Sequence, residues 1–166
     1  MLKWFKGVLG VGLLALLAAC GGGEEERPDL VALAQSNPEL SILAEAVTAA
    51  DLASTLSGPG SYTVFAPTNA AFADLLTRLG ITKEALLADR ALLTKVLTYH
   101  VVAGRVLRAD VPLGTPITTL QGETFTVDAS LTITDQCGCN ARIVTADVLA
   151  GNGVVHVIDH VLLPAF

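Results

Sequence analysis

The sequence is poor in basic residues and carries no surplus of positive charge. Its 166 residues include 10 Lys and Arg against 16 Asp and Glu, which gives a formal net charge of −6. Proteins that bind nucleic acid usually present a basic patch to the phosphates, so this balance argues against a nucleic-acid partner. Anionic lipid headgroups would repel the same charge. Attachment to a membrane would therefore need an anchor other than surface charge.

The sequence also lacks the short motifs of common enzyme classes. It contains no G-x-S-x-G nucleophile turn, no H-E-x-x-H zinc helix, no P-loop and no G-x-G-x-x-G dinucleotide turn. To act as a catalytic base, His100 would need a nucleophile or carboxylate beside it, and no such residue can be identified from the sequence. We therefore predict a non-enzymatic protein without a cofactor.

The apolar run near the N-terminus, residues 8–19, is too short to cross a bilayer, which takes about 20 apolar residues. Lys3 and Lys6 precede this run and Leu-Ala-Ala-Cys at 17–20 ends it, an arrangement typical of a cleaved signal peptide. The ending resembles the bacterial lipobox, in which the cysteine is acylated. An ordinary signal peptide cut before a free cysteine is the alternative. We expect Cys20 to carry the lipid.

The segment after this cysteine has the composition of a tether. Residues 20–28 contain glycines and glutamates but no large apolar side chain, so they have nothing to contribute to a core. We expect residues 1–19 to be a signal peptide, 20–28 an acidic tether and 29–166 one folded domain. Cleavage would leave 8 basic against 16 acidic residues, a net charge of −8. The protein would then be exported and held by its lipid on the cell envelope, at the outer membrane or cell surface.

Cysteine is scarce, with three residues in the chain. If Cys20 is acylated, Cys137 and Cys139 remain as a possible pair, and an oxidising compartment favours a disulfide between them. Gly138 makes the tight bend feasible because glycine tolerates unusual backbone dihedrals. Two alternatives stay open: redox-active or intermolecular thiols, and half of a zinc shell.

The remaining pattern predicts helices first and strands afterwards. Apolar spacing of three and four residues recurs up to about residue 98, with Asn37, Thr68 or Asn69, Thr82 and Asp89 as helix starts. A strand at 62–66 interrupts these helices. The later strands are expected at 116–120, 124–127, 131–134, 142–146 and 154–163. This order indicates an α+β domain.

Two segments carry a family resemblance: TVFAPTNAAF at 63–72 and NGVVHVIDHVLLP at 152–164. Together with Tyr99-His100 and the two valines that follow, they resemble the signature motifs of the fasciclin-like (fasciclin I) domain. The resemblance implies a wedge of two small β-sheets packed beside a group of N-terminal helices. It also implies adhesion, with Tyr99, His100 and the pair Asp147-Val148 as candidate contact residues. For Asp147-Val148, a turn residue beside core valine is the simpler interpretation.

Two histidines, His156 and His160, are four residues apart, a spacing found in metal sites on helices. On a strand their rings would stand about 13 Å apart at roughly 3.3 Å per residue, too far for one ion. We therefore predict no metal here and a structural role for His156. His100 is likewise expected to be buried and hydrogen-bonded, tying the helices to the sheet.

These features together favour a lipid-anchored adhesion module that binds a protein or glycan. Two alternatives remain. One is a lipophilic ligand, a pigment or lipid, bound in a groove between helices and sheet. The other is an envelope scaffold that recruits another envelope protein.

Overall fold

The computed structural model describes residues 27–58 and 60–165, and the predictions for Cys20 and the signal peptide lie outside this part. Among the described residues, no helix combines the length and apolar character that crossing a membrane requires. The helices are α2 (Leu30–Ser36), η3 (Pro38–Leu40), α3 (Ser41–Ala49), α4 (Ala53–Leu56), α5 (Asn69–Leu79), α6 (Lys83–Ala88), α7 (Arg90–Tyr99) and η4 (Arg108–Asp110). The strands are β2 (Tyr62–Pro67), β3 (Val101–Ala103), β4 (Ile117–Thr118), β5 (Thr124–Val127), β6 (Thr132–Thr134), β7 (Asn140–Ala150) and β8 (Gly153–Ile158).

Local capping explains where several helices begin and end. The side chains of Thr68, Thr82 and Asp89 accept hydrogen bonds from the first turns of α5, α6 and α7. Such caps satisfy backbone donors that the helix itself leaves unpaired. Gly80 ends α5 in the left-handed conformation, at φ 68°. These boundaries agree with the sequence prediction.

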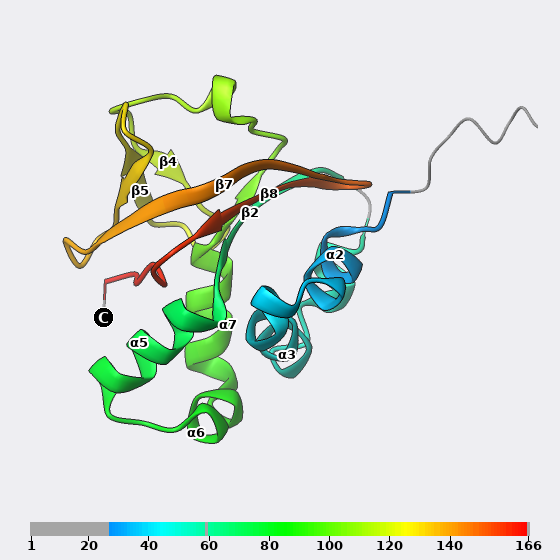
Figure 1. Ribbon diagram of the computed structural model, residues 1–166, viewed down its shortest axis with the longest axis vertical. Coiled ribbons are helices and arrows are strands. Elements are labelled where there is room, and N and C mark those ends of the chain that lie inside the picture. Colours follow the sequence, from blue (N-terminus) through cyan, green and yellow to red (C-terminus); the bar gives the residue numbers. More distant parts are fainter. Residues whose placement is uncertain (1–26, 59, 166) are drawn as a thin grey trace, which may run out of the picture.

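The strands are hydrogen-bonded in one order, β3-β2-β8-β7-β6-β5-β4. Strands β2 and β8 are parallel, from Tyr62 opposite Gly153 to Pro67 opposite Ile158, and the other pairs are antiparallel. Figure 1 shows helices α2, α3, α5, α6 and α7 on one side of the long strands β7 and β8, with β4, β5 and the short η4 on the other side. The α+β class is confirmed. The strands expected as two small sheets are joined into this seven-stranded order.

The two signature segments meet in the central pair β2 and β8, which is buried on both faces. Val64 and Val155 pack into the hydrophobic cluster that the helices cover. Phe65 and Ile158 belong to a second cluster on the opposite side, together with Phe125 of β5. Burial on both sides explains why these strands show no alternation of polar and apolar residues. The predicted meeting of the two motifs is confirmed, although the interior divides into two clusters.

The last predicted strand, residues 154–163, is too long. Strand β8 ends at Ile158, and Asp159 Oδ1 then accepts a hydrogen bond from Arg142 N at 2.7 Å. Beyond this bend, the N–H groups of Leu162 and Leu163 donate to side chains on distant elements. The apolar residues continue, but their backbone has no strand partner. Strand β7 is in turn longer than predicted, with irregular register between Ile143 and Val148.

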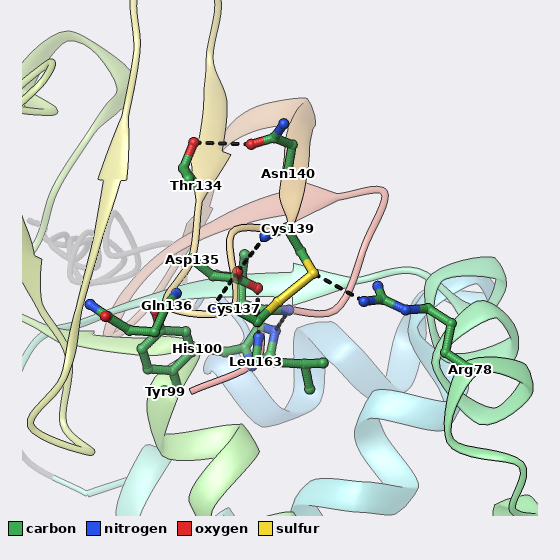
Figure 2. The surroundings of a disulfide bond; sticks show 11 residues. Arg78, Tyr99, His100, Thr134, Asp135, Gln136, Cys137, Cys139, Asn140 and Leu163 are labelled. Atoms are coloured by element: carbon green, nitrogen blue, oxygen red, sulfur yellow. Dashed lines mark hydrogen bonds between the residues drawn. A yellow bond between two sulfur atoms is a disulfide. The ribbon is translucent and has the colours of Figure 1, made fainter. Parts of the chain in front are cut away.

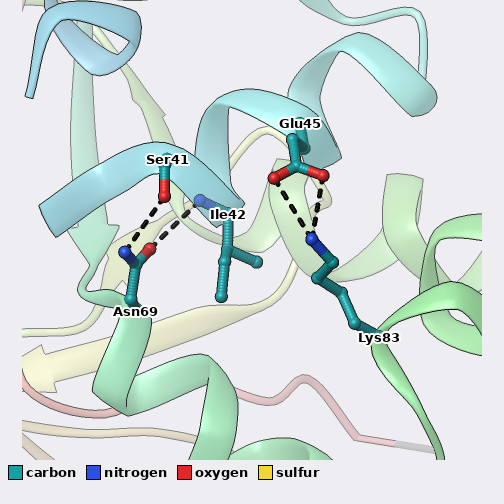
Figure 3. A network of polar contacts seen from close by, with 5 residues as sticks. All are labelled: Ser41, Ile42, Glu45, Asn69 and Lys83. Carbon is teal, nitrogen blue, oxygen red and sulfur yellow. Dashed lines mark hydrogen bonds and ion pairs between the residues drawn. The ribbon is translucent and has the colours of Figure 1, made fainter. Parts of the chain in front are cut away.

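Asn69 connects the first signature motif to the N-terminal helices (Figure 3). Its Oδ1 accepts a hydrogen bond from Ile42 N at 3.1 Å. Its Nδ2 donates to Pro38 O at 2.8 Å and to Ser41 Oγ at 3.0 Å. The residue before α3 provides no side-chain cap, so Asn69 supplies from α5 the acceptor that the start of α3 needs. Nearby, Lys83 pairs with Glu45 at 3.1 Å, an exposed contact of small energetic value.

We expect Asn69→Ala to lower the free energy of unfolding by about 2 kcal/mol, because it removes a helix cap and two further hydrogen bonds. Urea denaturation followed by circular dichroism measures the loss. Asn140→Ala is the matched control, since the Asn140 side chain accepts one exposed hydrogen bond from Thr134. Equal losses in the two variants would contradict the capping role.

Candidate functional site

The segment Asp135–Cys139 connects β6 to β7 and is called the disulfide loop below (Figure 2). A disulfide joins Cys137 to Cys139, whose Cα atoms are 5.4 Å apart. Gly138, at φ 76°, provides the left-handed conformation that this bend requires. In the chain-entropy account, a covalent ring around so few residues stabilises the fold by only roughly 1–2 kcal/mol.

Asp135 is the buried centre of this loop. Its Oδ1 accepts hydrogen bonds from Cys137 N at 3.1 Å and Cys139 N at 2.8 Å. Its Oδ2 accepts one from Leu163 N at 2.9 Å. The carboxylate therefore orders the disulfide loop and ties it to the C-terminal segment.

Tyr99 and His100, at the end of α7, lie beneath the disulfide loop (Figure 2). The Tyr99 hydroxyl donates to Thr124 O at 2.8 Å and accepts from Gln136 N at 3.2 Å. Burial raises the pKa of Tyr99 to about 12, because the phenolate would lose its hydration. The hydroxyl thus stays protonated and joins β5 to the loop.

His100 makes the equivalent connection to the C-terminal segment. Its Nε2 accepts a hydrogen bond from Leu162 N at 2.9 Å, so its Nδ1 carries the proton and donates to Val96 O at 2.7 Å. Burial lowers the pKa of His100 to about 4, since the imidazolium would be desolvated. Its position is that of a structural, neutral histidine.

The burial of these two residues bears on their candidate adhesion role. Tyr99 is 0% and His100 is 1% exposed, so neither side chain reaches a partner at the surface. Their contribution to adhesion stays a prediction, and it would act through the segments that they position.

Asp147 and Val148 lie in the irregular part of β7. Asp147 is exposed at φ 57°, and its Oδ1 accepts a hydrogen bond from Arg108 N at 2.6 Å. Val148 is half-buried against the helix-side cluster. Two other apolar side chains of the same strand, Val144 and Leu149, are 54% and 40% exposed. Val144, Asp147 and Leu149 are called the exposed strip of β7. Within it, Asp147 also has a structural partner, the N–H of Arg108.

The two histidines of the second motif lie in different settings. His156 is fully buried, accepts a hydrogen bond from Asp147 N at 3.3 Å and donates to Val106 O at 2.8 Å. His160 follows the end of β8 and pairs with Asp159 at 2.9 Å. With both ring nitrogens of His156 engaged in protein hydrogen bonds, it has no lone pair left for a metal ion.

Across the described residues, one cluster has three potential metal ligands in reach of one another, namely Asp135, Cys137 and Cys139. Its two sulfurs are bonded to each other, and the carboxylate already accepts three backbone hydrogen bonds. Metal binding by thiolates would first require reduction.

Sequence reasoning missed Arg78, in the last turn of α5. Its Nη2 lies 3.0 Å from Cys139 Sγ, although the two residues are 61 positions apart. No local pattern reveals this contact, because it depends on how α5 lies against the β6–β7 hairpin.

Two hollows are lined by the described helices, one of them also by the sheet. An apolar cavity enclosed by α2, α3, α4 and β2 measures about 20 Å³, room for one water molecule at most. A groove of about 470 Å³ between α2, α3 and α6 is open to solvent. The cavity is far smaller than the pigment or lipid considered from the sequence.

Residues 38–164 match the sequence profile of the Fasciclin domain. The chain is 43% identical over 139 residues to Protein sll1483 of Synechocystis, covering 81% of this chain and 73% of that protein. It is 43% identical over 152 residues to Immunogenic protein MPT70 of Mycobacterium tuberculosis, covering 86% and 72%.

Two further matches bear on architecture and setting. The chain is 42% identical over 136 residues to Cell surface glycolipoprotein MPB83 of Mycobacterium bovis, covering 79% of this chain but only 58% of that one. The solved FAS1 domain pair of the insect cell adhesion molecule Fasciclin I superposes with a TM-score of 0.54 at 26% identity. That superposition covers 76% of this chain and 46% of the domain pair.

Proposed function

The chain belongs to the Fasciclin domain family, and from this membership we propose that it is a non-enzymatic, lipid-anchored envelope protein that mediates adhesion by binding a protein or glycan. The observation that carries the proposal is the family match over residues 38–164, which includes both signature motifs. The relatives include a cell surface glycolipoprotein and an immunogenic protein. The Leu-Ala-Ala-Cys sequence at 17–20 supports the lipid anchor on Cys20.

The exposed strip of β7 is the contact surface that we propose. Val144 and Leu149 leave apolar area in solvent beside the acidic Asp147, a combination of apolar and polar groups found in recognition surfaces. Along the strip, β7 pairs with β8 at Thr145, Val148 and Leu149, whereas β6 pairs only with residues 140–142. Pairing with β8 limits how far the strip would have to reorganise on binding.

A gene deletion complemented with variants tests the proposal. We expect the deletion to reduce adhesion to the partner surface and the parent gene to restore it. The double variant Val144→Asp/Leu149→Asp should be produced as folded protein but restore less than about a fifth of the adhesion. A charge placed in an apolar contact costs about 1–3 kcal/mol. Leu113→Asp is the control: Leu113 is 51% exposed but lies in a loop outside β7.

The anchor is tested in the same strain by Cys20→Ser. This variant should lose incorporation of labelled fatty acid, appear in the soluble fraction and fail to restore adhesion. A deletion strain that adheres like its parent would refute the adhesion role. If crosslinking on intact cells captured only envelope proteins of the same cell, it would favour an envelope scaffold instead.

A further inference from the structure

The disulfide loop keeps its shape through hydrogen bonds that do not involve sulfur. Asp135 N donates to Cys139 O and Gly138 N donates to Asp135 O, both at 3.1 Å. The Asp135 carboxylate adds the bonds to Cys137 N and Cys139 N. These hydrogen bonds hold the two cysteines together, and the disulfide adds little to them because a ring around one intervening residue removes little chain entropy. Reduction would leave a preorganised pair of thiols.

The two sulfurs have different surroundings. Cys137 is exposed and open to a nucleophile, whereas Cys139 is half-buried with the Arg78 guanidinium 3.0 Å from its sulfur (Figure 2). A nearby cation stabilises a thiolate and so makes it a better leaving group. The Asp135 carboxylate, within 4.8 Å of both sulfurs, opposes this effect, but three backbone N–H groups share its charge. Arg78 therefore distinguishes Cys139 from Cys137.

We propose that the Cys137–Cys139 disulfide is a thiol–disulfide exchange site for the cysteine thiols of another polypeptide. A thiolate of that polypeptide attacks Cys137 Sγ and forms a mixed disulfide. The electron pair of the broken S–S bond passes to Cys139 Sγ, which leaves as a thiolate beside Arg78.

A second thiolate of the same polypeptide then attacks its own sulfur in the mixed disulfide and expels Cys137 as a thiolate. The polypeptide has lost two protons and two electrons and gained a disulfide, and the loop holds two thiols. The reaction is stoichiometric, needs no cofactor and does not depend on the adhesion role. It requires only a dithiol partner.

Exchange kinetics of the purified chain test this site, with Cys20→Ser in every sample so that Cys137 and Cys139 are its only cysteines. The probe is a synthetic peptide with two cysteine thiols, at pH 7. We expect the chain to oxidise it at least tenfold faster than glutathione disulfide does, because the leaving thiolate is stabilised. Mass spectrometry after acid quenching should find the mixed disulfide on Cys137.

Substitutions of Arg78 test whether its cation promotes the exchange or the residue has a purely structural role. Arg78→Met should lower the exchange rate threefold or more, whereas Arg78→Lys should retain more of it because it keeps the cation. Arg90→Met is the matched control, since Arg90 is an exposed arginine at the start of α7 whose ion-pair partner, Asp51 at 3.9 Å, lies in the turn between α3 and α4. It should exchange like the parent.

Cys137→Ser with Cys139→Ser tests whether the bond is only a clamp. We expect this variant to stay folded, with a melting temperature lowered by no more than about 10 °C, and to leave the peptide reduced. Three results would overturn the proposal: a parent rate no higher than that of glutathione disulfide, an unchanged rate in Arg78→Met, or loss of the folded state on reduction.

Discussion

Gly153→Ala should remove at least about 4 kcal/mol from the free energy of unfolding, or prevent folding altogether. Gly153 lies opposite Tyr62 at the start of the parallel pair β2 and β8. A Cβ atom there would overlap the Tyr62 carbonyl oxygen and stand 2.9 Å from its carbonyl carbon and 3.1 Å from its nitrogen. These are backbone atoms, so no side chain can turn aside to make room. The two strands would have to separate.

Separation at this point affects both hydrophobic clusters, because β2 and β8 are the strands between them. Their next residues, Thr63 and Val154, are fully buried. Opening the pair would also break the hydrogen bond from Tyr62 N to Asn152 O and expose backbone groups that have no other partner. The expected loss therefore exceeds that of an ordinary core substitution.

Chemical denaturation of Gly153→Ala and of Gly58→Ala measures this effect against a control. A Cβ at Gly58 would meet two carbonyl oxygens, of Ser54 and Thr55, at 3.3 and 3.4 Å, distances that a small shift relieves. We expect that control to stay within about 1 kcal/mol of the parent. A Gly153→Ala protein that is as stable as the control would show that the close approach is not required.

The sequence predicted those features of the fold that short-range interactions determine. Thr82 and Asp89 cap the helices that follow them because the acceptor and the N–H donor are three residues apart. The buried central strands were equally recognisable, since continuous apolar runs between turn signals mark strands covered on both faces. Their pairing was predicted only as a meeting of two motifs, and the parallel direction was not foreseen.

What the sequence could not show depends on long-range partners. Asn69 was considered as a cap for its own helix but caps α3, and Arg78 reaches a cysteine 61 residues away. The strand predicted to continue to Leu163 stops early because His100 and Asp135 take the backbone donors that a neighbouring strand would have used. The pattern of apolar residues indicates which segments are buried, but it does not indicate which acceptor each backbone N–H binds.

His100 should make the protein less stable in mildly acidic solution. Burial lowers its pKa from the usual 6.5 to about 4. Between these pH values His100 is protonated in the unfolded chain and neutral in the folded protein. Its contribution is complete above pH 6.5 and is lost as the pH falls towards 4. At about 1.4 kcal/mol per pH unit, the loss from this residue is about 2 kcal/mol between pH 7 and pH 5, and about 3 kcal/mol in all.

The carboxylates act in a lower range, which keeps the two effects apart. Hydrogen bonds from Ser130 and Thr132 hold the pKa of Asp128 below the usual 3.8. For Asp159, burial acts to raise the pKa, but hydrogen bonds from His160 and Arg142 outweigh it and lower the pKa as well. The contribution of both groups is present above 3.8 and is lost at still lower pH. Between pH 7 and pH 5 these two carboxylates therefore stay ionised, apart from the range in which His100 acts. The pH slope, rather than stability at one pH, is the informative measurement.

His100→Gln should flatten this slope by about 2 kcal/mol over the same range, whatever stability it loses at pH 7. Loss is expected there, because Leu162 N–H and Val96 C=O are buried and depend on the imidazole. If His100→Gln does not fold, nuclear magnetic resonance of the parent gives the same answer. An imidazole signal of His100 that titrates near pH 6.5 would contradict its burial in the neutral form, and one that stays unchanged down to about pH 5 would support it.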